Sequence, residues 1–336
     1  MFTWVFLAAL LLLFVVVGGP LAFFWKRRRT AVLRSLIVGY PALALVLVFG
    51  IAPYWLAAVI AHAGTRPMDA RLRDTPASYG LTFEDVSFDA DDGVNLKGWF
   101  VAPGSRRAVI IGSHGLFRNR VELLARLVPA CKAGYGMLLY DSRSHGASDR
   151  AIVSFGYYER RDVLGAVRYV ERRYAEPASR PAIVLMGVSM GAVATLEAAS
   201  QSSAYAALIL DSPFSDLRQT VTDHVRLFLG LPRFPFPDLF IFWYSRIAGF
   251  DPGLSDSHLA LKKAKPVPLL IIGSEGDERI PSRVARSLYE ESPAALKRLK
   301  IFGSDVPHGA SARLHPQEYW EMLQSFLSEA LPGSDP

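Results

Sequence analysis

Apolar and polar residues follow two patterns between residues 81 and 331 of the chain. Residues 81–89 and 94–102 alternate apolar and polar positions around Asp91-Asp92-Gly93, which predicts an antiparallel hairpin with its turn at the Asp-Gly pair. After the hairpin come short unbroken apolar runs, which are typical of strands buried on both faces of a sheet. These runs are residues 108–112, 136–140, 182–186, 206–210, 267–272 and 299–302.

Stretches with a helical spacing of apolar residues lie between the runs. They predict helices at residues 121–132, 157–174, 190–200, 282–291 and 316–330. Strands that alternate with helices of this length build a mostly parallel sheet with helices on both faces. We therefore expect one α/β domain over residues 81–331, with the hairpin as its antiparallel edge, followed by a tail at residues 332–336.

One segment, residues 212–265, breaks the alternation because it is too long for a plain connection between two strands. It contains a proline-rich stretch at residues 229–237 and an aromatic stretch at residues 240–244. We interpret it as a cap inserted over the active site. The alternative is a helical insertion that packs on the sheet edge and does not contact substrate.

Two apolar stretches without a charged side chain precede the domain, at residues 2–25 and 35–61. Each is long enough to cross a hydrocarbon core of about 30 Å as a helix. A cleavable signal peptide is the alternative for the first stretch, but no early Lys or Arg and no small-residue cleavage site is present. We predict a membrane anchor of two transmembrane helices over residues 1–64 and a linker over residues 65–80.

A basic loop between the two stretches, residues 26–34, carries five Lys or Arg side chains and is expected to stay in the cytoplasm. Both termini and the catalytic domain would then be extracytoplasmic or periplasmic. Arg66, Arg71 and Arg73 follow the second stretch and weigh against this orientation.

The composition fits this picture, since 51% of the 336 residues are hydrophobic and 20% are charged. The net charge of +6 comes from scattered residues and the one basic loop, so we do not expect nucleic-acid binding. Cys131 is the single cysteine, which excludes an intramolecular disulfide and favours a buried structural thiol. No Cys or His cluster has metal-ligand spacing, so no metal and no cofactor is implied.

The pentapeptide Gly187-Val-Ser-Met-Gly191 lies between a predicted buried strand and a predicted helix. At such a point a serine is held in a strained turn, and small flanking glycines let the neighbouring chain approach it. The hydroxyl then lies at a helix N-terminus, where partial positive charge favours a developing oxyanion. We identify Ser189 as the candidate nucleophile and the Met190 N–H as one oxyanion donor. The alternative is an ordinary turn with an inert serine.

A serine hydroxyl needs a base to remove its proton. In this architecture an acid and then a histidine follow the serine, each in a loop after a later strand. Asp277 is the candidate acid; its neighbour Glu275 is less favoured, and Asp211 is the fallback. Of the seven histidines, His308 alone lies in the expected loop and is the candidate base, whereas His315 begins the last helix.

The loop Ser113-His114-Gly115-Leu116-Phe117 follows the first predicted parallel strand and is expected to supply the second oxyanion donor. Gly115 permits a tight turn there, and the N–H of Leu116 is the candidate donor. His114 could be taken for a catalytic base, but we favour a structural role in holding the loop.

Together these segments resemble the α/β-hydrolase superfamily over about residues 81–331. Asp141-Ser-Arg-Ser-His-Gly-Ala-Ser148 resembles the D-x-R-G-H-G-x-S stretch of that family, with Ser144 where the family usually has glycine. This stretch is structural in the family, which implies that Asp141, Arg143 and His145 fix a loop. Leu210-Asp-Ser-Pro-Phe214 resembles a turn of the membrane-tethered Bem46-like hydrolases and of the serine-aminopeptidase-like and prolyl-oligopeptidase-like group.

The resemblance implies hydrolysis of an ester, thioester or amide through an acyl-enzyme intermediate, but it identifies no substrate. The chain lacks the separate propeller domain that restricts prolyl oligopeptidases to short peptides, which favours an esterase. A small-molecule acyl substrate, such as a lipid with an apolar chain, would suit the bilayer anchor and the aromatic insertion. A peptidase or amidase with the same residues, or an inactive scaffold with the same fold, are the alternatives.

Overall fold

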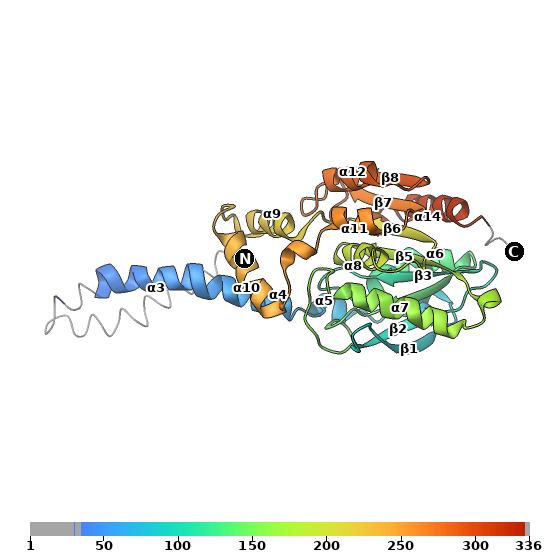
Figure 1. The fold of residues 1–336 in the computed structure, drawn as a ribbon, viewed down its shortest axis with the longest axis horizontal. Helices are drawn as coiled ribbons and strands as arrows, with labels where there is room; N and C mark the ends of the chain where they lie inside the picture. The colour runs from blue at the N-terminus through green and yellow to red at the C-terminus, as the bar shows by residue number, and fades with distance from the viewer. Residues whose placement is uncertain (1–29, 31–34, 333–336) are drawn as a thin grey trace. The chain divides into compact units, whose positions relative to one another are not determined.

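An eight-stranded sheet is the core of the second half of the fold, in a computed structural model that describes residue 30 and residues 35–332; Figure 1 labels its strands and the helices around it. The strands follow the spatial order β1-β2-β4-β3-β5-β6-β7-β8. β1 and β2 pair antiparallel at one edge, β2 also pairs antiparallel with β4, and all later pairings are parallel. The bounds are β1 (Glu84–Asp89), β2 (Asn95–Val101), β3 (Ala108–Ser113), β4 (Gly136–Tyr140), β5 (Ala182–Val188), β6 (Ala207–Asp211), β7 (Leu269–Ser274) and β8 (Lys297–Phe302).

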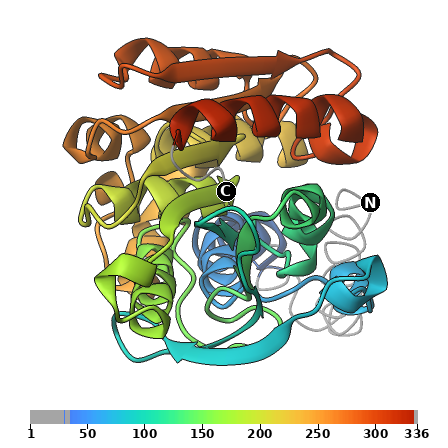
Figure 2. The same ribbon diagram turned by 90° about the vertical axis from the view of Figure 1, so that its right-hand side faces the viewer.

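Helices cover both faces of this sheet, as Figure 2 shows. One layer contains α7 (Glu159–Arg173), α8 (Met190–Ala199), α11 (Ser257–Lys263) and α12 (Ser282–Glu291). The other contains α6 (Val121–Lys132) and α14 (Pro316–Ala330). The strands are apolar at successive positions because both of their faces are buried. Ile111 and Leu185 pack into the first layer, whereas their neighbours Ile110 and Met186 pack into the second.

The mostly parallel sheet, its antiparallel edge and its two helical layers confirm the predicted fold class. Several strand and helix boundaries differ from the prediction by a few residues. β7 begins at Leu269 because Pro268 has no N–H to donate to a ladder. α7 begins at Glu159, two residues later than predicted.

Shorter helices complete the described chain: α5 (Pro67–Ala70), α13 (Ser311–Leu314) and the 3₁₀ turns η3 (Pro76–Tyr79), η4 (Pro177–Ser179) and η5 (Pro252–Leu254). The predicted linker, residues 65–80, is tied to the domain by Thr65. Its hydroxyl donates to Arg118 O at 2.9 Å and accepts from Gly146 N at 2.8 Å.

The chain divides into two compact units. One contains the described residues up to Val59 together with Val221–Ile247, and the other contains Ile60–Thr220 and Ala248–Pro336. The predicted division instead placed residues 212–265 within the catalytic domain and the anchor apart from it. That division, and the role of the insertion as a cap, stay predictions.

The first unit holds a long apolar helix, Ile37–Ala61, except for its last two residues, and this helix is long and apolar enough to cross a membrane. It is continuous through the π-helical turns η1 (Ser35–Gly39) and η2 (Leu47–Ile51) and the helices α3 (Tyr40–Val46) and α4 (Ala52–Ala61). It coincides with the second predicted span, residues 35–61. The first predicted span, residues 2–25, lies outside the described residues.

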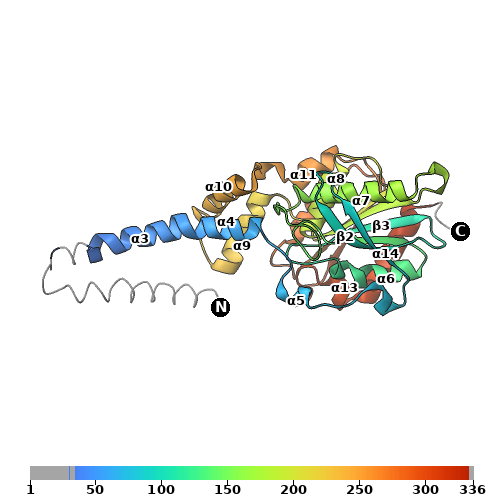
Figure 3. The ribbon, with the colours of Figure 1, turned by 90° about the horizontal axis from the view of Figure 1, so that it is seen from below.

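Two helices of the insertion, α9 (Leu217–Leu229) and α10 (Phe236–Ala248), lie beside this helix within the first unit (Figures 1 and 3). Phe49 stacks on Phe236 with ring centroids 5.5 Å apart. Tyr54 meets the edge of Trp243 at 5.3 Å. The apolar helix and the insertion are therefore packed together, although they are far apart in the sequence.

Candidate active site

Ser189 occupies a sharp turn between β5 and α8, with φ 55° and ψ −117°. A β-carbon on Gly187 would lie 2.1 Å from the carbonyl oxygen of Gly191, and one on Gly191 would lie 2.1 Å from that of Ser113. Both positions therefore require glycine. The left-handed backbone of a non-glycine residue is costly and is held here by the packed strand and helix.

The side chain of His308 lies between those of Ser189 and Asp277. The three residues follow the ends of three different strands of the sheet, β5, β7 and β8. The Nε2 of His308 is 2.9 Å from the Ser189 Oγ, and its Nδ1 is 2.6 Å from the Asp277 Oδ2. Since a carboxylate can only accept, Nδ1 carries the proton and Nε2 is free to accept the serine hydroxyl hydrogen. The structure thus brings together the three residues that the sequence pattern selected.

The Asp277 carboxylate is almost fully buried, with 1% of its side chain exposed. Its second oxygen, Oδ1, accepts the backbone N–H groups of Arg279 and Ile280, each at 2.9 Å. These donors fix the carboxylate and keep it able to accept from His308. The loops after β7 and β8 are joined by Ser274, whose hydroxyl donates to Val306 O and Gly303 O.

The loop after β3 passes close to Ser189, since a β-carbon on Gly115 would lie 3.5 Å from the Ser189 Cβ. Glu122 in α6 accepts the Gly115 N–H at 2.7 Å. Two residues later, the backbone N–H of Phe117 donates to His145 Nε2 at 3.2 Å. Among the hydrogen bonds of the described residues, the N–H of Leu116 between them has no protein acceptor.

Leu116 packs against Met190, the first residue of α8, in a small apolar cluster. The first backbone N–H groups of a helix have no acceptor within the helix. Met190 directly follows Ser189 at the positive end of α8, and Leu116 packs beside it, so the N–H groups of Met190 and Leu116 stay the candidate oxyanion donors.

Two buried histidines near this loop hold backbone. His114 contacts Gly115 O through Nδ1 at 2.8 Å and accepts Ser142 N at Nε2, at 2.9 Å. His145 contacts Arg143 O through Nδ1 at 2.9 Å and accepts the Phe117 N–H at Nε2. Burial first, and then the His114 ring, lowers the pKa of His145 to about 3, so it is neutral at physiological pH.

The Asp141 stretch is a folded loop, with Asp141 at its centre. Asp141 accepts the Arg120 N–H through Oδ1 and the Ala147 N–H through Oδ2, each at 2.9 Å. Arg143 is buried and pairs with Asp162 at 2.7 Å and Asp92 at 2.9 Å. These contacts agree with the loop-fixing roles that the family resemblance implied.

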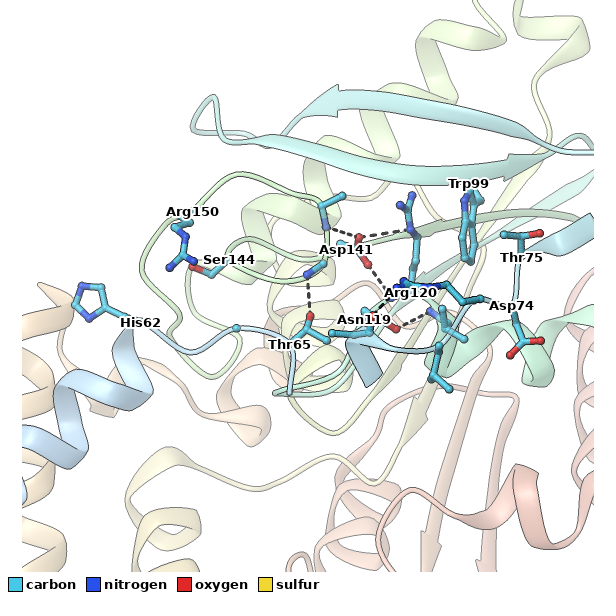
Figure 4. A pocket seen from close by; sticks show the side chains of 17 residues that line it. His62, Thr65, Asp74, Thr75, Trp99, Asn119, Arg120, Asp141, Ser144 and Arg150 are labelled. Carbon is cyan, nitrogen blue, oxygen red and sulfur yellow. Dashed lines mark hydrogen bonds and ion pairs between the residues drawn. The ribbon is translucent and has the colours of Figure 1, made fainter. Parts of the chain in front are cut away.

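A cavity of about 600 Å³ lies on the other side of this loop (Figure 4). Arg120 lies over the ring of Trp99 at 4.5 Å beside it, and Asp141, Thr65 and Arg150 also line it. None of the residues that line it belongs to the Ser189–His308–Asp277 set. It is therefore separate from the hydrogen-bonded serine.

A buried polar group beneath the His308 loop escaped the sequence analysis. Arg126 in α6 donates to Gly309 O at 2.5 Å and to Glu122 O at 2.6 Å, and its Nε lies 3.7 Å from Asp211. Asp211 also accepts the Tyr319 hydroxyl at 3.0 Å. Burial raises the pKa of Asp211 even with Arg126 beside it. The available signal was that Glu122 and Arg126, two charged residues, lie four apart among the apolar residues of α6.

Glu275 and His315, the other polar residues considered for the site, have partners outside the Ser189–His308–Asp277 set. Glu275 pairs with Arg286 at 2.7 Å on the surface, and His315 contacts Asp305 at 3.3 Å. Cys131 is half-buried, and burial raises the pKa of its thiol to about 12. Among residue 30 and residues 35–332, no group of three or more His, Cys, Asp or Glu side chains could hold a metal ion.

Known proteins are similar to this chain over most of its length. Residues 104–260 match the family model described as serine aminopeptidase, S33. The protein YqkD of Bacillus subtilis is 29% identical over 239 residues, which are 70% of this chain and 76% of the relative. The membrane protein YNL320W of Saccharomyces cerevisiae is 25% identical over 264 residues, 76% of this chain and 83% of the relative.

Solved structures share the fold. The Pyrococcus furiosus esterase Pf2001 superposes with a TM-score of 0.63 at 23% identity, over 80% of this chain and 98% of the esterase. The family match supports a hydrolase, and the sheet order, the strand-to-helix turn and the structural match agree on the architecture. The chain has the α/β-hydrolase fold.

Proposed function

We propose that this protein is a membrane-anchored serine hydrolase that cleaves a carboxylic ester or thioester through an acyl-enzyme intermediate. The observation that carries the proposal is the hydrogen-bonded series from the Ser189 hydroxyl through His308 to the buried Asp277 carboxylate. A serine is a weak nucleophile alone and is activated by a base that a third group orients.

In the proposed mechanism the Ser189 Oγ attacks the substrate carbonyl carbon while His308 Nε2 takes the hydroxyl proton. Asp277 holds the imidazole with its proton on Nδ1 and stabilises the imidazolium. The N–H groups of Met190 and Leu116 receive the oxyanion of the tetrahedral intermediate. His308 then protonates the leaving alkoxide or thiolate, and in the second half it removes a proton from the water that hydrolyses the acyl-Ser189 ester.

The proposed substrate class is supported by the apolar helix and by the composition of the insertion. The apolar helix Ile37–Ala61 supports anchoring in a bilayer, and the name of the yeast relative is that of a membrane protein. An aromatic insertion suits an apolar acyl chain, so we propose a lipid or a similar small acyl ester. The basic loop at residues 26–34 favours an extracytoplasmic catalytic domain.

A peptidase or amidase on the same residues is the second candidate, because the matching family model is that of a serine aminopeptidase. An amide has a poorer leaving group than an ester. The second candidate function also needs a binding site for the amine of the peptide. Turnover of a matched panel of acyl esters and aminoacyl amides by the purified protein separates the two. Preferential cleavage of the amides would refute the esterase proposal and support the peptidase or amidase.

Labelling with a fluorophosphonate probe tests the common mechanism in membranes that contain the full chain. We expect labelling of the wild type, none of Ser189→Ala, and labelling rates lower by on the order of 10³-fold or more for His308→Ala and Asp277→Asn. His315→Ala and Glu275→Gln are the matched controls, since each removes the same kind of group a short distance away, and both should label normally. A folded wild type that does not label would refute the mechanism.

A further inference from the structure

The insertion carries an apolar surface at the tip of its helical hairpin, between α9 and α10. The exposed apolar side chains are Leu227, Phe228, Leu229, Phe234 and Phe242, and Phe234 is the most exposed at 76%. Residues 225–237 include two arginines and no acidic residue. A surface of clustered aromatic and aliphatic side chains is costly in water and marks an interaction site.

The helix that packs against the hairpin indicates what covers this surface. Ile37–Ala61 is apolar throughout and has the length of a membrane span, and its side chains Leu45 and Val46 are more than half exposed. Phe49 and Tyr54 of that helix contact Phe236 and Trp243 of α10. The exposed surface of the hairpin therefore continues a surface that is itself fitted to lipid, within one unit of the structure.

The two aromatic contacts also indicate how deep in the bilayer the hairpin would lie. The chain beyond Ala61 belongs to the polar catalytic domain, so the C-terminal end of the span faces water and its N-terminal direction leads into the bilayer. Tyr54 and Trp243 are amphipathic rings suited to the interface. Phe49 lies five residues deeper along the helix, about 7.5 Å at 1.5 Å per residue.

The charges near the tip fit an interfacial position. Arg226 and Arg233 are exposed beside Phe228 and Phe234, and Arg246 lies near the water-facing end of α10 over the Phe242 ring at 3.6 Å. Long basic side chains extend from an apolar surface to the phosphate level of a membrane. An apolar face that enters about 5–10 Å with arginines at its margin is the arrangement of a helix embedded in one leaflet.

We infer that the α9–α10 hairpin is a second membrane contact of this protein, in which residues 227–242 insert into the same leaflet that Ile37–Ala61 enters from the catalytic side. The partner is the lipid bilayer itself. This inference rests on the proposed anchoring by the apolar helix, but it does not depend on the chemistry proposed for Ser189.

Spin labels on single cysteines test the inference in the full chain, in vesicles of phosphatidylcholine with phosphatidylglycerol, on a Cys131→Ala background. Phe228→Cys and Phe234→Cys report the hairpin, and both sites are exposed, so a label should not disturb packing. Val46→Cys reports the span. Leu259→Cys, an exposed apolar position on α11, is the matched control. The readout is relaxation of the label by oxygen, which concentrates in lipid, and by a water-soluble nickel complex.

We expect the hairpin labels to relax strongly with oxygen and to lose most of the nickel effect seen at Leu259. Nickel relaxation at Phe228 and Phe234 equal to that at Leu259, with the Val46 label protected, would overturn the hairpin contact and leave the anchor intact. A Val46 label open to nickel would instead overturn the anchoring on which the inference rests. Neither outcome depends on whether the protein hydrolyses an ester.

Discussion

Replacing Arg126 by methionine removes the guanidinium beside the buried Asp211 while keeping most of the apolar volume of the side chain. Arg126 has 7% of its side chain exposed, and Asp211 has 1%. Removing one partner of a buried ion pair costs about 3–5 kcal/mol, because the other charge is left without compensation. The freed Gly309 carbonyl, which the guanidinium holds at 2.5 Å, contributes to the same loss.

Thermal unfolding of the detergent-solubilised full chain measures this loss. For a catalytic domain of this size about 4 kcal/mol corresponds to a fall in the melting temperature of roughly 8–16 °C. Arg286→Met is the matched control, since Arg286 pairs with Glu275 on the surface, where about half of each side chain is exposed. Its loss should stay below about 1 kcal/mol.

A double-mutant cycle separates the charge from the packing. Asp211→Asn removes the carboxylate, so Arg126→Met should cost at least about 1 kcal/mol less in the Asp211→Asn background than in the wild type. Stability of Arg126→Met should also fall more steeply than that of the wild type as pH rises from about 4, because ionising Asp211 in the folded state costs more without Arg126. A loss below about 1 kcal/mol, or losses that add within about 0.5 kcal/mol, would refute the argument.

Two further outcomes follow from buried carboxylates. Burial raises the pKa of Glu197 in α8 to about 7, so ionising it costs the folded state stability as pH rises from about 4.5 to 7. Glu197→Gln should therefore be more stable than the wild type by up to about 3 kcal/mol at pH 8 and equally stable near pH 4. Chemical denaturation at a series of pH values measures this difference. A difference that does not change with pH would contradict the raised pKa of Glu197. Glu122→Gln should weaken the hydrogen bond that the Gly115 N–H donates. We expect it to lower kcat for a soluble ester by on the order of 10-fold with little change in KM. Steady-state kinetics beside the surface control Glu318→Gln checks this, and a change confined to KM would speak against a role in positioning the oxyanion loop.

The strand and helix boundaries were largely readable from sequence because the sheet is buried on both faces. A strand such as β5 is an unbroken apolar run, and Gly187 and Gly191 mark a place where chain must approach chain closely. The positions of Ser189, Asp277 and His308 could be predicted because parallel strands end at the same edge of a sheet, so chain order implies proximity.

Contacts between distant side chains were not readable in this way. Nothing local to α6 says that Arg126 reaches the Gly309 carbonyl, because that contact depends on how α6 and the His308 loop meet in three dimensions. The same holds for Phe236, whose place in an apolar aromatic stretch fits equally well with packing against the sheet, a substrate or another helix. Its partner, Phe49, lies in a segment that sequence alone assigns only to the membrane.

The packing of α10 against the apolar helix has a consequence for the order of biosynthesis. Phe49 leaves the ribosome roughly 190 residues before Phe236, which at about 5–20 residues per second is an interval of about 10–40 s. If the helix is anchored as proposed, lipid or the insertion machinery covers Phe49 during that time, because its partner on α10 has not yet been made. The hairpin then displaces that cover, so α10 packs against the helix only after the strands up to β6 have emerged.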